Sequence, residues 1–353
     1  MGASALPARD LSERDPQWLK ARGDQFAQAK DFMGAINAYS AALLQQADMV
    51  AVLSNRALCH LQRGHALAAL DDCCRALSLV CAPWGGAPRV APLQEDLWQQ
   101  VVQTRTQVHV VGAVAAKNPP AESTQPTAAA PQPAAEADAD AALGTFTRLM
   151  ARRAAAFCQQ GMFLQAQQDL HCAAKACQLR EGQASRAQEL QEDGEFMGEL
   201  HQAQLLCGAA KACGGEAVEA AVEKLSEALQ LSDGSMPVAL LNRAACFAKL
   251  QRFPEAVDDC TAALSVVMAS NGSDMFLPVP PAMSDAGQKL KLQILTRRGL
   301  LLAHLGLWSD ALPDLRSALS LNPADEQLRK DMQLAAHKVA VVEHTVPGPA
   351  EQQ

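Results

Sequence analysis

Five polar residues at regular spacings are the first candidates for chemistry in this chain of 353 residues. Lys20 and Asp24 are four residues apart, as are Arg148 and Arg152, and Asn55 lies between the two pairs. Side chains four residues apart share one face of an α-helix, so each pair predicts one helix face. Three cations and an amide could donate hydrogen bonds to an anionic group. Because one exposed ion pair contributes only ~0–1 kcal/mol and micromolar affinity needs about −8 kcal/mol, several of these donors would have to act together.

An internal repeat indicates the helices that would position these residues. The segment VLSNRALCHL at 52–61 has a near copy, ALLNRAACFA, at 239–248, and a looser one, LMARRAAAFC, at 149–158. Self-comparison gives a period of 34 residues, with small residues at three fixed places that let helices approach closely. The small residues are Gly23, Ala35 and Ala42; Ala57, Ala69 and Ala76; Ala154, Ala166 and Ala173; Gly208, Ala221 and Ala228; Ala244, Ala256 and Ala263; and Gly299, Ala311 and Ala318, with Pro323 closing the last repeat.

This helix-pair pattern resembles the tetratricopeptide repeat and predicts an all-α solenoid of two arrays, each with three helix-pair repeats, closed by capping helices. Insertions at matching places suggest that a unit of three repeats was duplicated. The expected organisation is a disordered N-terminus at 1–15; a first array at 16–181 with an inserted helix at 93–117 and a disordered insertion at 118–142; a second array at 182–341 with a loop insertion at 269–286; cap helices at 182–200 and 324–341; and a disordered tail at 342–353.

Composition narrows the class of protein. Hydrophobic residues make up 49% of the chain and aromatic residues only 4%, which favours helices packed through small side chains. The net charge of −8 disfavours nucleic-acid binding, and no apolar run approaches the length of a membrane span. The eleven cysteines lack metal-ligand spacing, so buried, reduced thiols in a cytoplasmic protein are expected. Without a catalytic motif, we expect no enzyme, no metal and no cofactor.

The first array would bring the five candidate residues together. In tetratricopeptide stacks the first helix of each repeat lines a concave groove, and the pattern resembles that family's carboxylate clamp, in which Lys, Asn, Asn, Lys and Arg hold the C-terminal carboxylate of heat-shock chaperone tails. Lys20, Asn55 and Arg152 match this pattern, and Arg148 replaces a lysine. Asp24 stands where the family has Asn; its charge would repel a carboxylate, although Lys20 could pair with it. The alternative is that Lys20, Arg148 and Arg152 are ordinary solvated helix charges.

The second array lacks most of this pattern. Its corresponding places hold Leu205, Ala209, Asn242, Gln293 and Arg297, so only one Asn and one Arg remain. We interpret Asn242 as a residue retained for packing or for a backbone hydrogen bond. The more apolar groove would suit a helix or an extended apolar segment of a protein partner.

Four segments of the first array resemble the dynein axonemal assembly factor 4 family. They are DPQWLKARGDQF at 15–26, AINAYSAAL at 35–43, NRALCHLQRG at 55–64 and RRAAAFCQQGMFLQAQQDL at 152–170. In that family the repeats follow a CS domain and act with heat-shock chaperones in cytoplasmic preassembly of ciliary dynein arms. Only fifteen residues precede the first repeat here, so the expectation is a fragment, a divergent member, or another multi-array co-chaperone such as sperm-associated antigen 1.

The resemblance implies a non-enzymatic co-chaperone adaptor in the cytoplasm, with an association with the cilium. Its expected partners are heat-shock chaperone tails and dynein chains or other dynein assembly factors, with no nucleic acid and no membrane. The alternative is a structural scaffold that binds partner helices through apolar grooves and never recognises a carboxylate.

Overall fold

The computed structural model describes residues 15–82, 133–212, 217–270, 276 and 278–345, with the side chains of 133–139 and 342–345 left aside. All regular structure in these ranges is α-helical, which agrees with the predicted all-α tetratricopeptide solenoid. The helices are α1 (Pro16–Gln28), α2 (Phe32–Gln45), α3 (Val50–Gln62), α4 (Ala66–Cys81), α6 (Pro133–Gln159), α7 (Phe163–Gln178), α8 (Ala184–Ala212), α9 (Val218–Leu231), α10 (Pro237–Lys249), α11 (Phe253–Ala269), α12 (Asp285–His304), α13 (Trp308–Leu321) and α14 (Glu326–Thr345).

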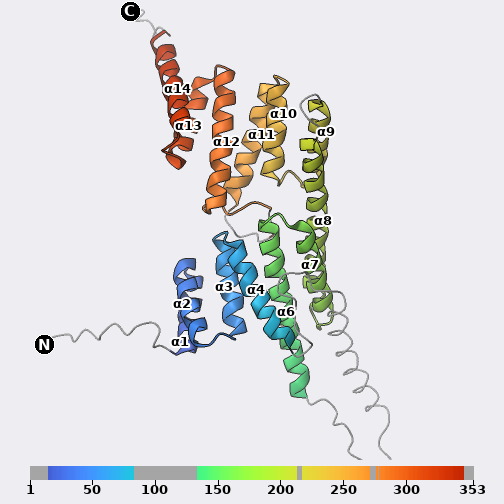
Figure 1. Ribbon diagram of the computed structural model, residues 1–353. Helices are drawn as coiled ribbons and strands as arrows, with labels where there is room; N and C mark the ends of the chain where they lie inside the picture. The colour runs from blue at the N-terminus through green and yellow to red at the C-terminus, as the bar shows by residue number, and fades with distance from the viewer. Residues whose placement is uncertain (1–14, 83–132, 213–216, 271–275, 277, 346–353) are drawn as a thin grey trace, which may run out of the picture. The chain divides into compact units, whose positions relative to one another are not determined.

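The helices pack in sequence-adjacent pairs, as the repeat requires (Figure 1). The first pairs are α1 with α2, α3 with α4, and α6 with α7; later pairs are α10 with α11 and α12 with α13, while α9 packs on α10. Asp15 begins the first pair, since its carboxylate accepts hydrogen bonds from the backbone N–H groups of Gln17 and Trp18. None of the described helices has a long enough apolar stretch to cross a membrane.

Five of the pairs share one turn between their two helices. In each, the chain takes a positive φ just after the first helix, at Lys30, Gly64, Gly161, Gln251 and Gly306. The next backbone N–H then donates back into the helix it has left; the N–H of His65, for example, bonds the carbonyl of His60 at 2.8 Å. This is the Schellman geometry, which satisfies carbonyls at a helix end. The same turn therefore sets the same angle between the helices of successive repeats.

The small residues of the 34-residue period form the core between paired helices. Nearly all of the predicted positions are buried, including Ala57, Ala154, Ala244 and Ala318, which are 0% exposed. Gly208 is the exception, because it is exposed and no atom in the described part of the chain lies within 4 Å of where its Cβ would be. At the end of the chain, α14 covers α13, and Leu328 and Ala335 join the last hydrophobic cluster.

The helix boundaries correct three expectations. The C-terminal part of the expected disordered segment 118–142 is helical, because α6 begins at Pro133. The expected cap at 182–200 is not a separate helix but part of α8, which continues to Ala212 without a break. The final helix extends to Thr345, into the expected tail at 342–353. Alanine predominates at the start of α6, and none of the three stretches has a proline in the helix interior to stop it.

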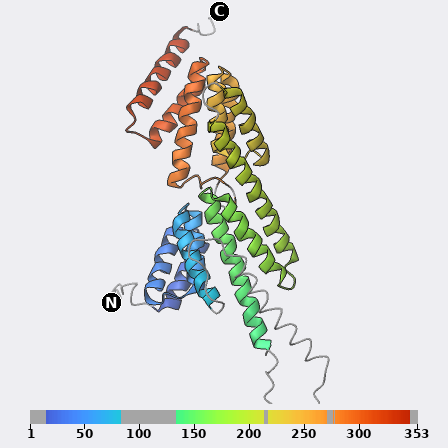
Figure 2. The same cartoon turned by 45° about the vertical axis from the view of Figure 1, so that its right-hand side comes forward.

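Two compact units make up the chain, Met1–Met197 and Gly198–Gln353, and the division falls inside α8. The expected helix at 93–117 and the expected disordered N-terminus, apart from Asp15, lie outside the described residues, as does the end of the tail from residue 346. The connection between α11 and α12 occupies the place of the expected insertion at 269–286, with 271–275 and 277 outside the described residues. Figure 2 shows the helix pairs of each unit from a second direction.

Candidate peptide-binding grooves

Three of the five candidate residues in the first unit form one hydrogen-bonded network around Asp24. Lys20 Nζ lies 2.7 Å from Asp24 Oδ2, within α1. The other carboxylate oxygen, Oδ1, accepts hydrogen bonds from the Tyr39 hydroxyl at 2.6 Å and from Asn55 Nδ2 at 3.1 Å. Asp24 therefore ties together the first helices of two repeats and the intervening α2.

The network keeps Asp24 ionised. Burial acts to raise the pKa of this carboxyl, but hydrogen bonds from Lys20, Tyr39 and Asn55 outweigh burial and lower it below its usual value. Burial and the neighbouring Asp24 also raise the pKa of the Tyr39 hydroxyl, so this group stays a proton donor. The first unit thus has a fixed negative charge where the expected clamp has a neutral amide.

Arg152 is half-buried and links α6 to α3. Its Nη1 donates to both the carbonyl oxygen and the hydroxyl of Ser54, each at 2.5 Å. Ser54 directly precedes Asn55, so this contact places the guanidinium beside the Asp24 network. Burial raises the pKa of Cys59 to about 11, while the charges of Arg152 and Asp24 act on this thiol with opposite sign. Arg152 and Asp24 therefore both lie near the turn of α3 that contains Cys59.

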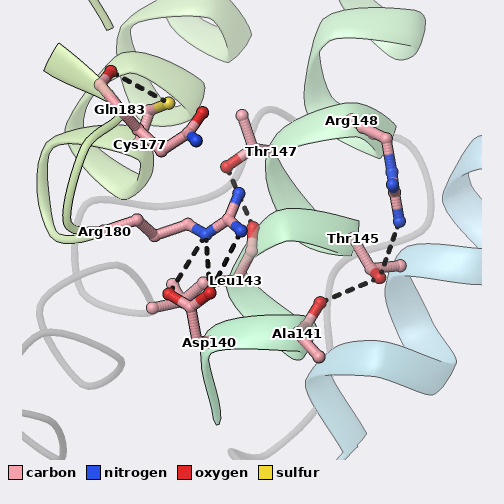
Figure 3. A network of polar contacts seen from close by, with 9 residues as sticks. All are labelled: Asp140, Ala141, Leu143, Thr145, Thr147, Arg148, Cys177, Arg180 and Gln183. Carbon is pink, nitrogen blue, oxygen red and sulfur yellow. Dashed lines mark hydrogen bonds and ion pairs between the residues drawn. The ribbon is translucent and has the colours of Figure 1, made fainter. Parts of the chain in front are cut away.

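Arg148 is more exposed than Arg152 and keeps one weak contact. Its guanidinium donates to Thr145 Oγ1 at 3.2 Å, and Thr145 in turn bonds the carbonyl of Ala141. Burial lowers the pKa of Arg152, and the charge of Arg148 contributes to this shift, so the two guanidinium groups are near neighbours. Figure 3 shows Arg148 pointing away from Arg180 and Asp140, which form their own ion pair on α6 and the segment after α7.

The candidate residues of the second unit lie along one groove. Asn242, Gln293 and Arg297 line a cavity of about 570 Å³ between α10 and α12, together with apolar residues such as Val238 and Leu300. Arg297 Nη1 donates to the carbonyl of Leu241 at 2.6 Å. Leu241 precedes Asn242 as Ser54 precedes Asn55, so Arg297 repeats the anchoring contact of Arg152. Leu205 of α8 is 61% exposed and, like Ala209, has no contact with this cavity.

A set of ion pairs, buried or partly buried, escaped the sequence reasoning. In four repeats an arginine that directly follows a groove-facing residue pairs with an aspartate sixteen positions later, on the second helix of the same repeat. The pairs are Arg56 with Asp72, Arg153 with Asp169, Arg243 with Asp259, and Arg298 with Asp314, all bidentate. The recurring spacing is visible in the sequence and could have revealed them. These pairs fix the first helix of each repeat to the second, and the groove residues lie on the adjoining face of the first helix.

Helix pairs with a 34-residue period, one shared turn and an inner row of polar residues define a tetratricopeptide-repeat protein. The chain is similar to dynein axonemal assembly factor 4 from Pongo pygmaeus, with 31% identity over 120 residues, which is 34% of this chain and 24% of that protein. The match thus spans about a quarter of the length of the curated relative. No protein-family model matches the chain.

Solved structures of tetratricopeptide proteins also resemble the chain. The Arabidopsis OM64 TPR domain is 24% identical and superposes with a TM-score of 0.31, covering 39% of this chain and 98% of that domain. The TPR2AB domain of yeast Sti1 in complex with pHSP90 is 15% identical with a TM-score of 0.30, covering 92% of this chain and 98% of that one. The assignment of the fold rests on the period, pairing and turns of this chain itself.

Proposed function

We propose that the chain is a non-enzymatic co-chaperone adaptor whose first unit binds the acidic C-terminal tail of a heat-shock chaperone. The clustering of Lys20 and Asn55 around Asp24, with Arg152 bonded to the adjoining Ser54, carries this proposal, and Arg148 is a nearby and more exposed cation. Charge-assisted hydrogen bonds from several such donors can hold a terminal carboxylate. The second unit would then hold a client or another assembly factor.

The similarity to dynein axonemal assembly factor 4 supports a finer proposal. We propose that the adaptor acts in cytoplasmic preassembly of axonemal dynein arms, with dynein chains or other dynein assembly factors as its second partners. Recovery of axonemal dynein chains together with a heat-shock chaperone, from the cytoplasm of ciliated cells and in an Arg152-dependent manner, would support this role. Recovery of neither protein would contradict it.

Fluorescence polarisation tests the tail-binding proposal. A labelled peptide ending in Glu-Glu-Val-Asp with a free carboxylate is expected to bind, with an affinity that falls as salt is added, because exposed charges are screened. The same peptide with an amidated C-terminus should bind at least tenfold more weakly. Arg152→Ala should remove most of the binding.

Loss of the Ser54 contact could also alter the fold in Arg152→Ala, and the second unit offers a matched control. Arg297→Ala removes the equivalent contact to the carbonyl of Leu241 and leaves the candidate residues of the first unit unchanged. It should bind the tail peptide like the unmodified protein. Equal weakening by the two substitutions would show that the effect is structural.

The alternative, a scaffold that binds partner helices, is favoured by the apolar lining of the second-unit groove at Val238, Leu292 and Leu300. It predicts association that is insensitive to salt and that tolerates Arg148→Ala together with Arg152→Ala. Equal binding of the free and amidated peptides would favour this alternative over the adaptor.

A further inference from the structure

The space beside Asn55 in the first unit is filled, whereas the space beside its counterpart, Asn242, is open. The ring of Tyr39 packs directly on Gly23, which leaves no room for a Cβ there. Its hydroxyl and Asn55 Nδ2 both bond Asp24. Tyr39 and Asp24 thus close the space between α1, α2 and α3.

The second unit lacks both of these groups. The position of Tyr39 holds Leu225, and the position of Asp24 holds Ala209. Accordingly, no atom of the described residues lies within 4 Å of where a Cβ on Gly208, the counterpart of Gly23, would be. A cavity of about 370 Å³ opens between the end of α8, α9 and α10, and Leu225 and Asn242 form part of its lining.

Asn242 has lost the partner that Asn55 keeps. Its Nδ2 is buried and has no hydrogen-bond partner among the described residues. A buried amide donor without an acceptor costs free energy, which an entering ligand oxygen would recover. Because Asn242 lines both this cavity and the groove toward α12, its amide lies between the two.

Two lysines replace uncharged residues around the same cavity. Lys211 stands at the position of Phe26, and Lys249 at the position of Gln62. Both lysines line the cavity and are exposed, so their ammonium groups can reach a ligand. No acidic side chain occurs among the described residues that line this cavity or the neighbouring groove. The cavity is therefore positively charged within a chain whose net charge is −8.

We propose that the cavity of the second unit, lined by Lys211, Lys249 and Asn242, binds an acidic side chain within a segment of a partner protein. An Asp or Glu carboxylate would accept from Asn242 Nδ2 and pair with the two lysines. Neighbouring apolar residues of the same segment would pack in the groove beside Val238 and Leu300. The partner is thus a protein segment that alternates acidic and apolar residues, and its chain end need not be free. This inference rests on the proposed adaptor function, because it specifies the chemistry of the partner that the second unit would hold.

The test uses the full chain and a fluorescent peptide that alternates Asp and Leu, acetylated and amidated at its ends. Amidation removes the terminal carboxylate that the first unit is proposed to bind. Binding is expected, and Lys211→Gln with Lys249→Gln should weaken it about tenfold. Arg152→Ala should leave it unchanged. Tail binding by the first unit can therefore fail while this interaction persists, and the reverse can also occur.

A matched control is Lys330→Gln with Lys338→Gln, which removes the same charge from exposed positions on α14. It should bind the peptide like the unmodified protein. A peptide with Asn in place of Asp should bind at least tenfold more weakly. The proposal is overturned if the acidic and Asn peptides bind equally, if both lysine pairs have the same effect, or if a single-stranded oligonucleotide competes as well as the acidic peptide does.

Discussion

The Tyr39 hydroxyl donates a 2.6 Å hydrogen bond to Asp24 Oδ1, from the second helix of the first repeat to its first helix. Lys20 bonds the other oxygen of the same carboxylate at 2.7 Å. Lys20 and Asn55 could donate to the carboxylate of a ligand, but both already donate to the carboxylate of Asp24. Asp24 both orders the groove and competes with its proposed ligand.

Replacement of Asp24 should separate these two effects. Asp24→Asn keeps an oxygen that can accept from Tyr39 and Asn55, but it removes the negative charge and releases Lys20. We expect the Glu-Glu-Val-Asp peptide to bind about fivefold more tightly, or ~1 kcal/mol, because a like charge beside the ligand is lost. Fluorescence polarisation at low salt measures this change.

Glu227→Gln removes the same charge from an exposed position on α9 and should leave the affinity for the tail peptide unchanged. If Asp24→Asn binds no better than this control, the Asp24 carboxylate does not face the ligand.

Gly23 and Gly208 offer a matched comparison of the filled and the open space. A Cβ at Gly23 would overlap Cε1 of the buried Tyr39 ring, whereas a Cβ at Gly208 would meet no atom of the described residues within 4 Å. Gly23→Ala should destabilise the protein by about 1–3 kcal/mol, since overpacking outweighs the better helix propensity of alanine. Gly208→Ala should stabilise it by about 0.5–1 kcal/mol. Thermal unfolding followed by circular dichroism checks both, and a stabilising Gly23→Ala would contradict the packing of Tyr39.

Patterns within short stretches of the sequence predicted the features that depend on neighbouring residues. The 34-residue period gave the helix pairs and nearly all of the buried small residues, and the spacing of Lys20 and Asp24 gave their ion pair. The contact of Arg152 with Ser54 joins residues 98 positions apart, across an insertion, so no helical periodicity could indicate it. The unbroken α8 was missed because Gly194, Gly198 and Gly208 lie within it and glycine often marks a helix end, although no proline interrupts this helix.

The ion pairs between paired helices should differ in their contribution to stability according to burial. Arg153 and Asp169 are both 0% exposed, whereas Arg298 is 20% and Asp314 is 8% exposed. Asp169→Ala would leave a guanidinium buried without its partner, and should cost about 3–5 kcal/mol. Asp314→Ala should cost less, about 1–2 kcal/mol, because water can solvate Arg298. Urea unfolding measures both, and equal losses would show that burial does not set the cost.

Replacement of Cys74 should stabilise the protein. In other repeats the residue at this position accepts a second hydrogen bond from the arginine of the ion pair. The positions equivalent to Cys74 in three other repeats hold a hydroxyl residue: Ser40, Ser226 and Thr261. Each hydroxyl accepts a hydrogen bond from Nη1 of the arginine in the following repeat; Arg56 Nη1, for example, lies 2.9 Å from Ser40 Oγ. Nη1 of Arg153 is buried without a nitrogen or oxygen acceptor among the described residues, and the neighbouring Cys74 thiol offers only a weak hydrogen bond.

Cys74→Ser should supply this acceptor and raise the free energy of unfolding by about 0.5–1.5 kcal/mol. The adjacent Cys73→Ser is the control, because Cys73 is 0% exposed in the apolar core and a hydroxyl there should destabilise by about 1–3 kcal/mol. Urea unfolding of both variants distinguishes a specific contact from a general preference for serine. If Cys74→Ser is as destabilising as Cys73→Ser, Arg153 Nη1 does not point at residue 74, and the equivalence of the four positions fails.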